Sequence, residues 1–290
     1  MKKILYIIAL ILITGINANA QDTQTISIRV PEFARPLVEN WTHEYQQHHP
    51  TQNFEFIKAN TQAERVIELT TDGNAVSFAR YAILPVTTRN SEAARLTSHR
   101  LNARKLRSLF FVSDDDDDDQ TIAEEKIHIY TGNSQLSASR IYASYLNEDI
   151  AGYKGKKISG DDAFLTTAIN RDPLGVTVNY LSNIFDLESR QPGSTLSLLP
   201  LDLDKHGRQV LDAANLDEII NLLESQQYAE IPVGSVGFAY NHDDMTINDF
   251  VNWVLTAGIA DLHSYGMLCL PQNELTVQMQ RVTNKDLAQK

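Results

Sequence analysis

The sequence predicts an α/β fold built in two lobes, and three observations support this prediction. Segments with alternating apolar residues are separated by segments with helical spacing, as in α/β proteins. This alternation runs through residues 25–113 and begins again at residue 126. No repeat or low-complexity linker separates two independent domains, so we expect the chain to cross between the lobes more than once.

The first block of the sequence alternates strands and helices. Leu37, Trp41 and Tyr45 lie four residues apart, which predicts a helix with one buried face at residues 36–49. A short helix is predicted at residues 63–73. The other predicted elements are three strands at residues 25–30, 53–59 and 75–87, and a helix at residues 102–113.

The second block begins at residues 126–134, where a strand leads through a polar loop into a helix that ends near residue 147. An amphipathic helix is predicted at residues 214–225, because its apolar residues fall on one stripe. Residues 246–268 predict one long helix followed by a last short strand. Further apolar segments lie at residues 163–171, 175–185, 196–203 and 233–241, the last of them a predicted strand.

Residues 1–20 have the features of a cleavable signal peptide. Lys2 and Lys3 form a basic start, an apolar run follows, and Ala18 and Ala20 provide the small residues of a cleavage site. The apolar run is shorter than the roughly 20 residues that span a bilayer. Because the cleavage region contains no cysteine, no lipid anchor is expected there. The sequence therefore predicts an exported, periplasmic protein that is not lipidated.

The charge and cysteine content exclude several classes of function. Loss of residues 1–20 would remove two lysines and no acid, so the formal charge would fall from −12 to −14. Such an acidic chain disfavours nucleic acid and anionic membrane surfaces as partners. Cys269 is the only cysteine, so no intramolecular disulfide is expected, and its apolar neighbours predict a buried thiol that is not a nucleophile.

Motifs for catalysis and metal binding are missing from the sequence. It contains no G-x-S-x-G elbow, no P-loop and no G-x-G-x-x-G fingerprint. The run Asp114–Asp119 predicts an exposed loop, with a calcium site as the weaker alternative. Residues 202–213 begin like an EF-hand loop, but Ala213 stands where a glutamate is needed. We therefore predict no catalytic residue, no metal site and no cofactor, and residues 241–245 are interpreted as a surface turn.

Residues 131–147 contain the strongest candidate for a binding site. Small hydroxyl and amide side chains fill the loop before the predicted helix, and they are Thr131, Asn133, Ser134, Ser137 and Ser139. A helix N-terminus offers unpaired N–H groups and about half a positive charge, which together suit an oxyanion. Arg140 would add a charge close by. The alternative is that Ser134 or Ser137 only caps the helix.

Six segments, in order, carry a resemblance to a known family. They are FARPLVENW, ARYAILPVT, LNARKLRSLF, YTGNSQLSASRIYASYL, LPLDLDKHGR and DEIINLLESQQYAEIP. In this order they resemble the phosphate-binding (PstS-like) branch of the periplasmic solute-binding proteins, in a Bacteroidetes-type subgroup. The resemblance implies a two-lobed type II periplasmic-binding-protein fold, in which each lobe is a mixed sheet flanked by helices. Residues 21–100 would begin lobe 1, residues 101–235 would form lobe 2, and residues 236–290 would return to lobe 1.

The resemblance also implies a site for phosphate or a similar small oxyanion between the lobes. Ser137 and Ser139 fall where the family has a Ser-Gly-Thr loop, whereas Asn133 stands in place of an arginine and Glu32 in place of a hydroxyl residue. The loop that contains Asn60 and Thr61 replaces a Gly-rich loop, and both side chains could donate. The expected ligand-binding residues are Asn133, Ser134, Ser137, Ser139, Arg140, Asn60, Thr61 and Glu32.

Arg35, Arg80 or Arg140 could supply the missing positive charge from elsewhere. The implied protein acts as a monomer and delivers its ligand to an ABC permease in the membrane, or to another envelope protein. Two other classes stay open. One is a ligand-free adaptor or signalling subunit with the same fold, and the other is an exported hydrolase whose serine, histidine and carboxylate would meet in the cleft.

Overall fold

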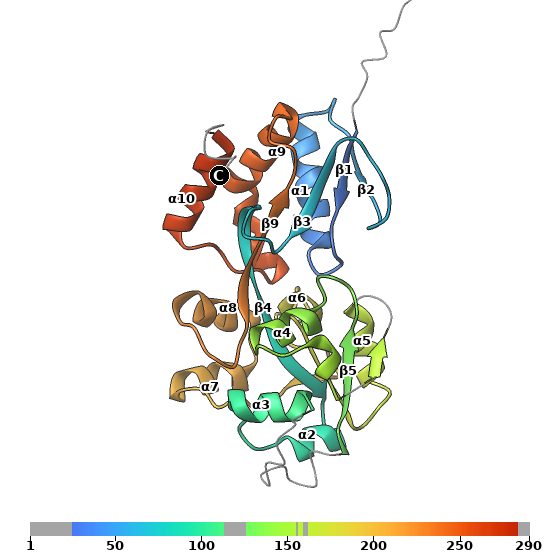
Figure 1. Ribbon diagram of the computed structural model, residues 1–290. Coiled ribbons are helices and arrows are strands. Elements are labelled where there is room, and N and C mark those ends of the chain that lie inside the picture. The colour runs from blue at the N-terminus through green and yellow to red at the C-terminus, as the bar shows by residue number, and fades with distance from the viewer. Residues whose placement is uncertain (1–24, 113–125, 155, 159–161, 284–290) are drawn as a thin grey trace, which may run out of the picture.

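The computed structural model describes residues 25–112, 126–154, 156–158 and 162–283. The predicted signal peptide at residues 1–20 and the run Asp114–Asp119 lie outside the described residues. Figure 1 shows two lobes, one above the other, joined by the long strand β4 (Val76–Thr88) and by β9 (Val233–Ala239). Among the helices of the described residues, none is long and apolar enough to cross a membrane.

The upper lobe in Figure 1 is a mixed sheet covered by helices. Its strand order is β2–β1–β3–β9–β4, with β1 parallel to β2 and β3, and with β9 antiparallel to β3 and β4. Its other elements are β1 (Ile26–Arg29), α1 (Arg35–His48), β2 (Phe54–Phe56), β3 (Val66–Thr70), α9 (Met245–Thr256), the 3-10 helix η3 (Gly258–Tyr265) and α10 (Gln272–Thr283).

The lower lobe continues the sheet in the order β4–β7–β5–β6, and β8 pairs with the end of β4. Strand β7 is antiparallel to β4, whereas β5 is parallel to both β7 and β6. The strands are β5 (His128–Gly132), β6 (Lys156–Ile158), β7 (Gly175–Tyr180) and β8 (Leu196–Leu198). The helices are α2 (Glu92–Leu96), α3 (Ala103–Phe110), α4 (Ala138–Tyr145), η2 (Ile150–Gly152), α5 (Ala163–Ile169), α6 (Leu181–Ile184), α7 (Lys205–Ala213) and α8 (Leu216–Ser225).

Strand β4 belongs to both halves of the sheet, because its partners change along its length. Val76 to Ala82 pair with β9, and Ile83 to Thr87 pair with β7. The predicted α/β fold with two lobes of mixed sheet and flanking helices is confirmed. We propose that the lobes divide within β4, near Ile83; the predicted boundaries at residues 100 and 235 stay predictions.

The helix predicted at residues 63–73 is wrong, since this segment forms strand β3. Ile67 and Leu69 are buried and alternate with the exposed Glu68, which is the period of a strand. Strand β3 pairs with β1 on one side and β9 on the other. This short apolar segment therefore forms a strand in a sheet, where both of its neighbours come from distant parts of the sequence.

The single long helix predicted at residues 246–268 is also wrong. Helix α9 ends at Thr256 and is followed by the 3-10 helix η3. The indole Nε1 of Trp41 donates a hydrogen bond of 2.8 Å to the carbonyl oxygen of Gly258, at the start of η3. Gly266 then ends η3 in the left-handed region, with φ of 72°, and the predicted last strand is reduced to an isolated bridge between Leu268 and Arg80.

Asp244 joins α9 to the loop before β3. Its Oδ1 accepts hydrogen bonds from the backbone N–H groups of Thr246 and Ile247, and both of its oxygens bind the guanidinium of Arg65, at 2.6 and 2.7 Å. The hydrogen bonds from Arg65 hold the pKa of Asp244 below its usual value, against the opposing effect of burial. Residues 241–245 are thus a helix start held by an ion pair.

We expect Asp244→Asn to lower the free energy of unfolding by about 1–2 kcal/mol at pH 7, because the amide keeps the cap but loses the charge-assisted bonds. Since the folded-state pKa is depressed, this contribution is complete above the unfolded pKa of about 3.9 and is lost as the pH falls through the folded value. Urea unfolding at pH 7 measures the loss of stability in the variant, and urea unfolding near pH 3 measures how far the difference from the wild type has decreased. Asp243→Asn, at the exposed neighbouring residue, is the control and should have little effect at either pH.

Candidate functional site

The loop between β5 and α4 is built around two buried serines. Ser137 is the N-cap of α4, and its Oγ accepts a hydrogen bond from the backbone N–H of Arg140 at 3.2 Å. The Oγ of Ser139 accepts one from the backbone N–H of Gly132, at the end of β5, at 3.1 Å. Both serines are fully buried. Their hydroxyl oxygens therefore already bind backbone groups of the same loop.

The carboxylate of Asp162 lies at the start of α4. Its Oδ2 accepts a hydrogen bond of 2.5 Å from the backbone N–H of Ala138, and the residue is only 2% exposed. The backbone carbonyl of Asp162 accepts a second hydrogen bond, of 2.8 Å, from the amide of Asn179. A negative group at a helix N-terminus is stabilised by the N–H groups and by the helix dipole. The chain thus places its own oxyanion at this helix start.

Asp162 was not among the residues predicted from the sequence. It is the residue before α5, where an aspartate normally caps its own helix, but it makes no side-chain cap to α5. Its carboxylate binds the start of α4 instead. An acidic residue before an apolar run is a general signal for a helix start, but it does not indicate which helix the side chain will cap.

Aromatic rings connect this loop to the upper lobe. The hydroxyl of Tyr180, at the end of β7, donates to the carbonyl oxygen of Leu136 at 2.7 Å. The ring of Phe33, just before α1, stacks on Tyr180 with centroids 3.8 Å apart, and Tyr81 of β4 packs edge-on against both rings. Burial raises the pKa of Tyr81 to about 12. Ser182 donates to the carbonyl oxygen of Phe33, which adds a polar contact beside the stack.

Solved structures with this arrangement of lobes identify the fold. The chain aligns with a protein from Clostridium perfringens described as a phosphate ABC transporter substrate-binding protein, solved with bound phosphate, at a TM-score of 0.61 and 11% identity, over 85% of this chain and 100% of that one. A phosphate transport receptor from Vibrio cholerae aligns at 0.57 and 11%, over 85% and 100%. The chain has the type II periplasmic-binding-protein fold.

A third structure, a possible phosphate-binding protein from Planctomyces limnophilus, aligns with a TM-score of 0.55 and 12% identity, over 92% of this chain and 99% of that one. No protein-family model matches the sequence, and the search of curated proteins found no match. At 11–12% identity the solved structures establish the type II binding-protein fold. The identity of a ligand has to be argued from this chain's own residues.

The other ligand-binding residues predicted from the sequence lie at the surface. Asn133 and Ser134 are exposed in the loop before α4, and Arg140 is exposed on α4 itself. Asn60 and Thr61 are exposed between β2 and β3, where Arg29 binds the carbonyl oxygen of Thr61 at 2.9 Å. The structure therefore gathers Ser137 and Ser139 with Asp162, and their role in ligand binding stays a prediction.

Three of the charged residues considered for this site, Glu32, Arg35 and Arg80, have partners elsewhere. Glu32 is exposed and lies 3.5 Å from Arg35, whose Nε also binds Glu39 at 2.7 Å. The Nε of Arg80 donates to the carbonyl oxygen of Cys269 at 2.9 Å. Arg35 and Arg80 thus bind groups outside the loop between β5 and α4. Arg140 is the arginine that stays closest to it in sequence.

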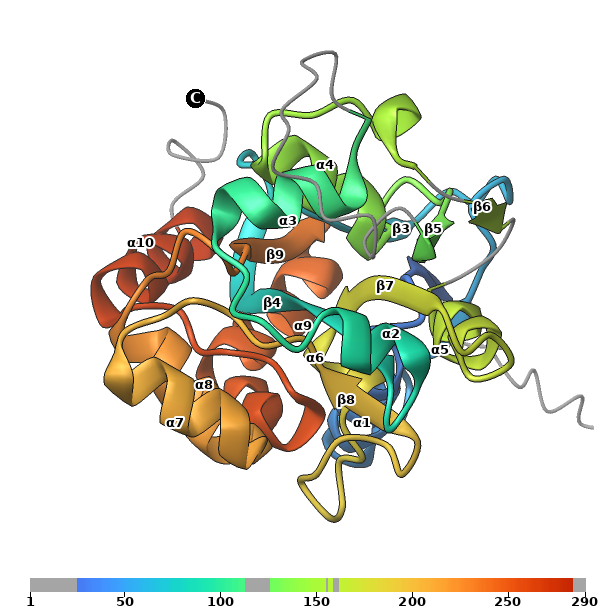
Figure 2. The ribbon, with the colours of Figure 1, turned by 90° about the horizontal axis from the view of Figure 1, so that it is seen from below.

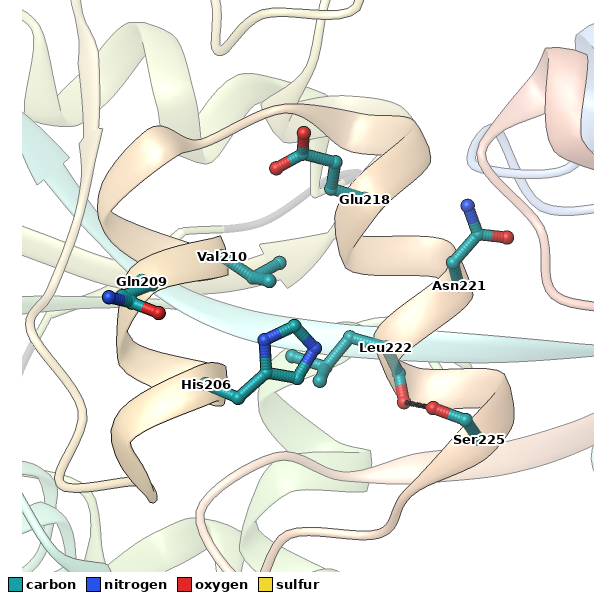
Figure 3. Close-up of a pocket in the computed structure, with 7 residues that line it drawn as sticks. All are labelled: His206, Gln209, Val210, Glu218, Asn221, Leu222 and Ser225. Carbon is teal, nitrogen blue, oxygen red and sulfur yellow. Dashed lines mark hydrogen bonds between the residues drawn. The ribbon is translucent and has the colours of Figure 1, made fainter.

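Helices α7 and α8 form a separate groove of about 490 Å³ on the lower lobe, with side chains of both helices pointing into it (Figure 3). The residues that line it are His206, Gln209, Val210, Glu218, Asn221, Leu222 and Ser225. The EF-hand-like stretch, residues 202–213, contains the whole of α7 and supplies one side of this groove. There the Oδ1 of Asp204 caps the helix by accepting from the backbone N–H of Gly207 at 2.7 Å.

Proposed function

We propose that this chain is an exported solute-binding protein that takes phosphate or a similar small oxyanion between its lobes and delivers it, as a monomer, to an ABC permease. The observation that carries the proposal is the start of α4, where a backbone N–H already binds an oxyanion, the carboxylate of Asp162. The type II binding-protein fold and the signal-peptide features of residues 1–20 support it. The solved structures are described as binding proteins rather than enzymes, which supports a function without catalysis.

An incoming oxyanion would compete with Asp162 for the N–H group of Ala138. A negative ligand and the carboxylate repel each other, so ligand entry requires that Asp162 moves away or takes up a proton. Ser137 and Ser139 would then contribute hydroxyl groups, and Arg140 a positive charge. In this proposal the carboxylate sets the affinity, because every ligand has to displace it.

A second candidate function is a ligand-free adaptor or signalling subunit in the periplasm. Two observations favour it: Asp162 occupies the start of α4, and Phe33 stacks on Tyr180 between that loop and the upper lobe. A site filled by the chain's own groups needs no solute. The partner would then be another envelope protein.

Calorimetry with phosphate and with sulfate tests the proposal. We expect the wild-type protein to bind phosphate, and Ser137→Ala to weaken the affinity at least about tenfold through loss of a charge-assisted hydrogen bond to the anion. Ser91→Ala is a matched control, since Ser91 caps α2 in the same way as Ser137 caps α4. No heat with either anion would contradict the receptor function and favour the adaptor.

A further inference from the structure

Three side chains with metal-binding donor atoms meet between α8 and the segment that follows η3. Glu224 lies near the end of α8, His263 lies in η3, and Cys269 follows the bridge residue Leu268. The Oε1 of Glu224 lies 2.8 Å from the Nε2 of His263, and the Sγ of Cys269 lies 3.4 Å from the same nitrogen. One donor atom from each residue lies within 4.8 Å of the other two.

This arrangement differs from a catalytic triad. In a triad the acid and the nucleophile contact opposite nitrogens of the histidine ring, so that one orients the ring and the other loses its proton. Here Glu224 and Cys269 both approach Nε2. Burial, with the negative charge of Glu224, also raises the pKa of Cys269 to about 11, which is the opposite direction from the lowered pKa of a catalytic cysteine.

Oxygen, nitrogen and sulfur donors that converge on one point are typical of a transition-metal site. With Zn²⁺ bond lengths of about 2.0–2.1 Å to nitrogen or oxygen and about 2.3 Å to sulfur, tetrahedral ligands lie about 3.3 Å (N–O) and 3.6 Å (N–S) apart. The observed separations of 2.8 and 3.4 Å need to open by only about half an ångström. We propose that Glu224, His263 and Cys269 bind a divalent transition metal ion of the Zn²⁺ class, with water as the fourth ligand.

Hydrogen bonds to the backbone hold two of the three ligands in place. Arg80 donates to the carbonyl oxygen of Cys269 at 2.9 Å, and Arg190 donates to the carbonyl oxygen of His263 at 2.7 Å. The backbone N–H of Cys269 also donates to Glu224 at 2.6 Å. Ligands that are positioned before the ion arrives bind it more tightly. The side chains of His263 and Glu224 are 42% and 23% exposed, which gives an ion access from solvent.

From the sequence, Cys269 was expected to be a buried thiol, and no metal site was predicted. The structure places Cys269 half-buried, beside a histidine and a glutamate. The proposed ion would connect α8 of the lower lobe (Figure 1) to η3, which packs on α1 and α9 of the upper lobe. Binding of an ion to the folded state alone raises stability.

Cys269 is the only cysteine of the chain, so a thiol reagent reports on this site alone. We expect one equivalent of Zn²⁺ to slow modification of the chelator-treated protein at least about tenfold, since the metal-bound sulfur is shielded. Co²⁺ should give a thiolate-to-cobalt absorption band in the near ultraviolet. His263→Gln and Glu224→Gln should each weaken the Zn²⁺ protection and the cobalt band at least about tenfold, because loss of a ligand costs more metal affinity than loss of a supporting residue. His206→Gln, in the α7–α8 groove, is the matched control.

The wild-type protein alone is sufficient to overturn the proposal. Unchanged thiol reactivity with Zn²⁺, together with no cobalt–thiolate band, would exclude a metal site at Cys269. Protection that is equally strong in His263→Gln would show that the ion binds the thiol without the cluster. Circular dichroism of each variant establishes that it is folded before it is compared.

Discussion

Asp162→Asn is expected to raise the affinity of the protein for phosphate at least about tenfold. The carboxylate occupies the N–H group of Ala138 that a phosphate oxygen would use, and the side chain is almost fully buried. Two unit charges 4 Å apart repel by about 4 kcal/mol at an effective dielectric constant of 20. A tenfold change in affinity needs about 1.4 kcal/mol, so a third of this repulsion is sufficient. The amide keeps the size and the hydrogen-bonding oxygen of the carboxylate.

Titration calorimetry of the wild type and the variant measures the change. Asp149→Asn is the matched control, because Asp149 is an exposed aspartate that caps η2 and should leave phosphate binding unchanged. Weaker phosphate binding by Asp162→Asn would contradict the expectation and would make Asp162 an acceptor for the proton of a bound phosphate. In that case the wild type should also prefer phosphate to the fully ionised sulfate.

Binding by the variant alone would support the adaptor function. The N–H groups at the start of α4 would then be able to bind an anion, but in the natural protein the carboxylate of Asp162 would exclude it. Binding by neither protein would exclude the start of α4 as an oxyanion site. The comparison thus separates the two proposed functions at a single side chain.

The local part of the candidate site was predictable from the sequence. A polar loop between a predicted strand and a predicted helix located the start of α4, and Ser137 was considered as its cap. Asp162 was not predictable in the same way, because it lies 24 residues after Ala138 and reaches α4 only through the fold. The stack of Phe33 on Tyr180 depends in the same way on contacts between distant segments.

The same division between local and distant contacts applies to the fold and to the proposed metal site. Helix α1 follows from its own periodicity and strand β4 from its apolar run, whereas β3 is a short segment that pairs with distant strands on both sides. Glu224 lies 39 residues before His263, in a different element, so no spacing motif could connect them. Sequence patterns therefore located segments more reliably than they located the residues that those segments contact.

Trp41→Ala is expected to lower the free energy of unfolding by about 3–5 kcal/mol, as for other buried aromatic side chains. Trp41 is completely buried under the upper lobe's sheet, where its ring packs edge-on against Phe78 and Phe238. Its Nε1 also donates to the carbonyl oxygen of Gly258, where the chain turns from α9 into η3. The substitution therefore leaves a cavity and a buried carbonyl group without its donor.

Urea unfolding followed by circular dichroism measures this loss without relying on tryptophan fluorescence. Trp253→Ala, at the only other tryptophan, is the control, and because Trp253 is partly exposed it should lose less than half as much stability. Trp41→Phe keeps much of the ring but not the Nε1 donor, and should lose about 1–3 kcal/mol for the unpaired carbonyl group and the reduced packing. Equal losses for Trp41→Ala and Trp253→Ala would contradict the central place of Trp41 in the upper lobe. A negligible loss for Trp41→Phe would show that packing, rather than the bond to Gly258, holds α1 against η3.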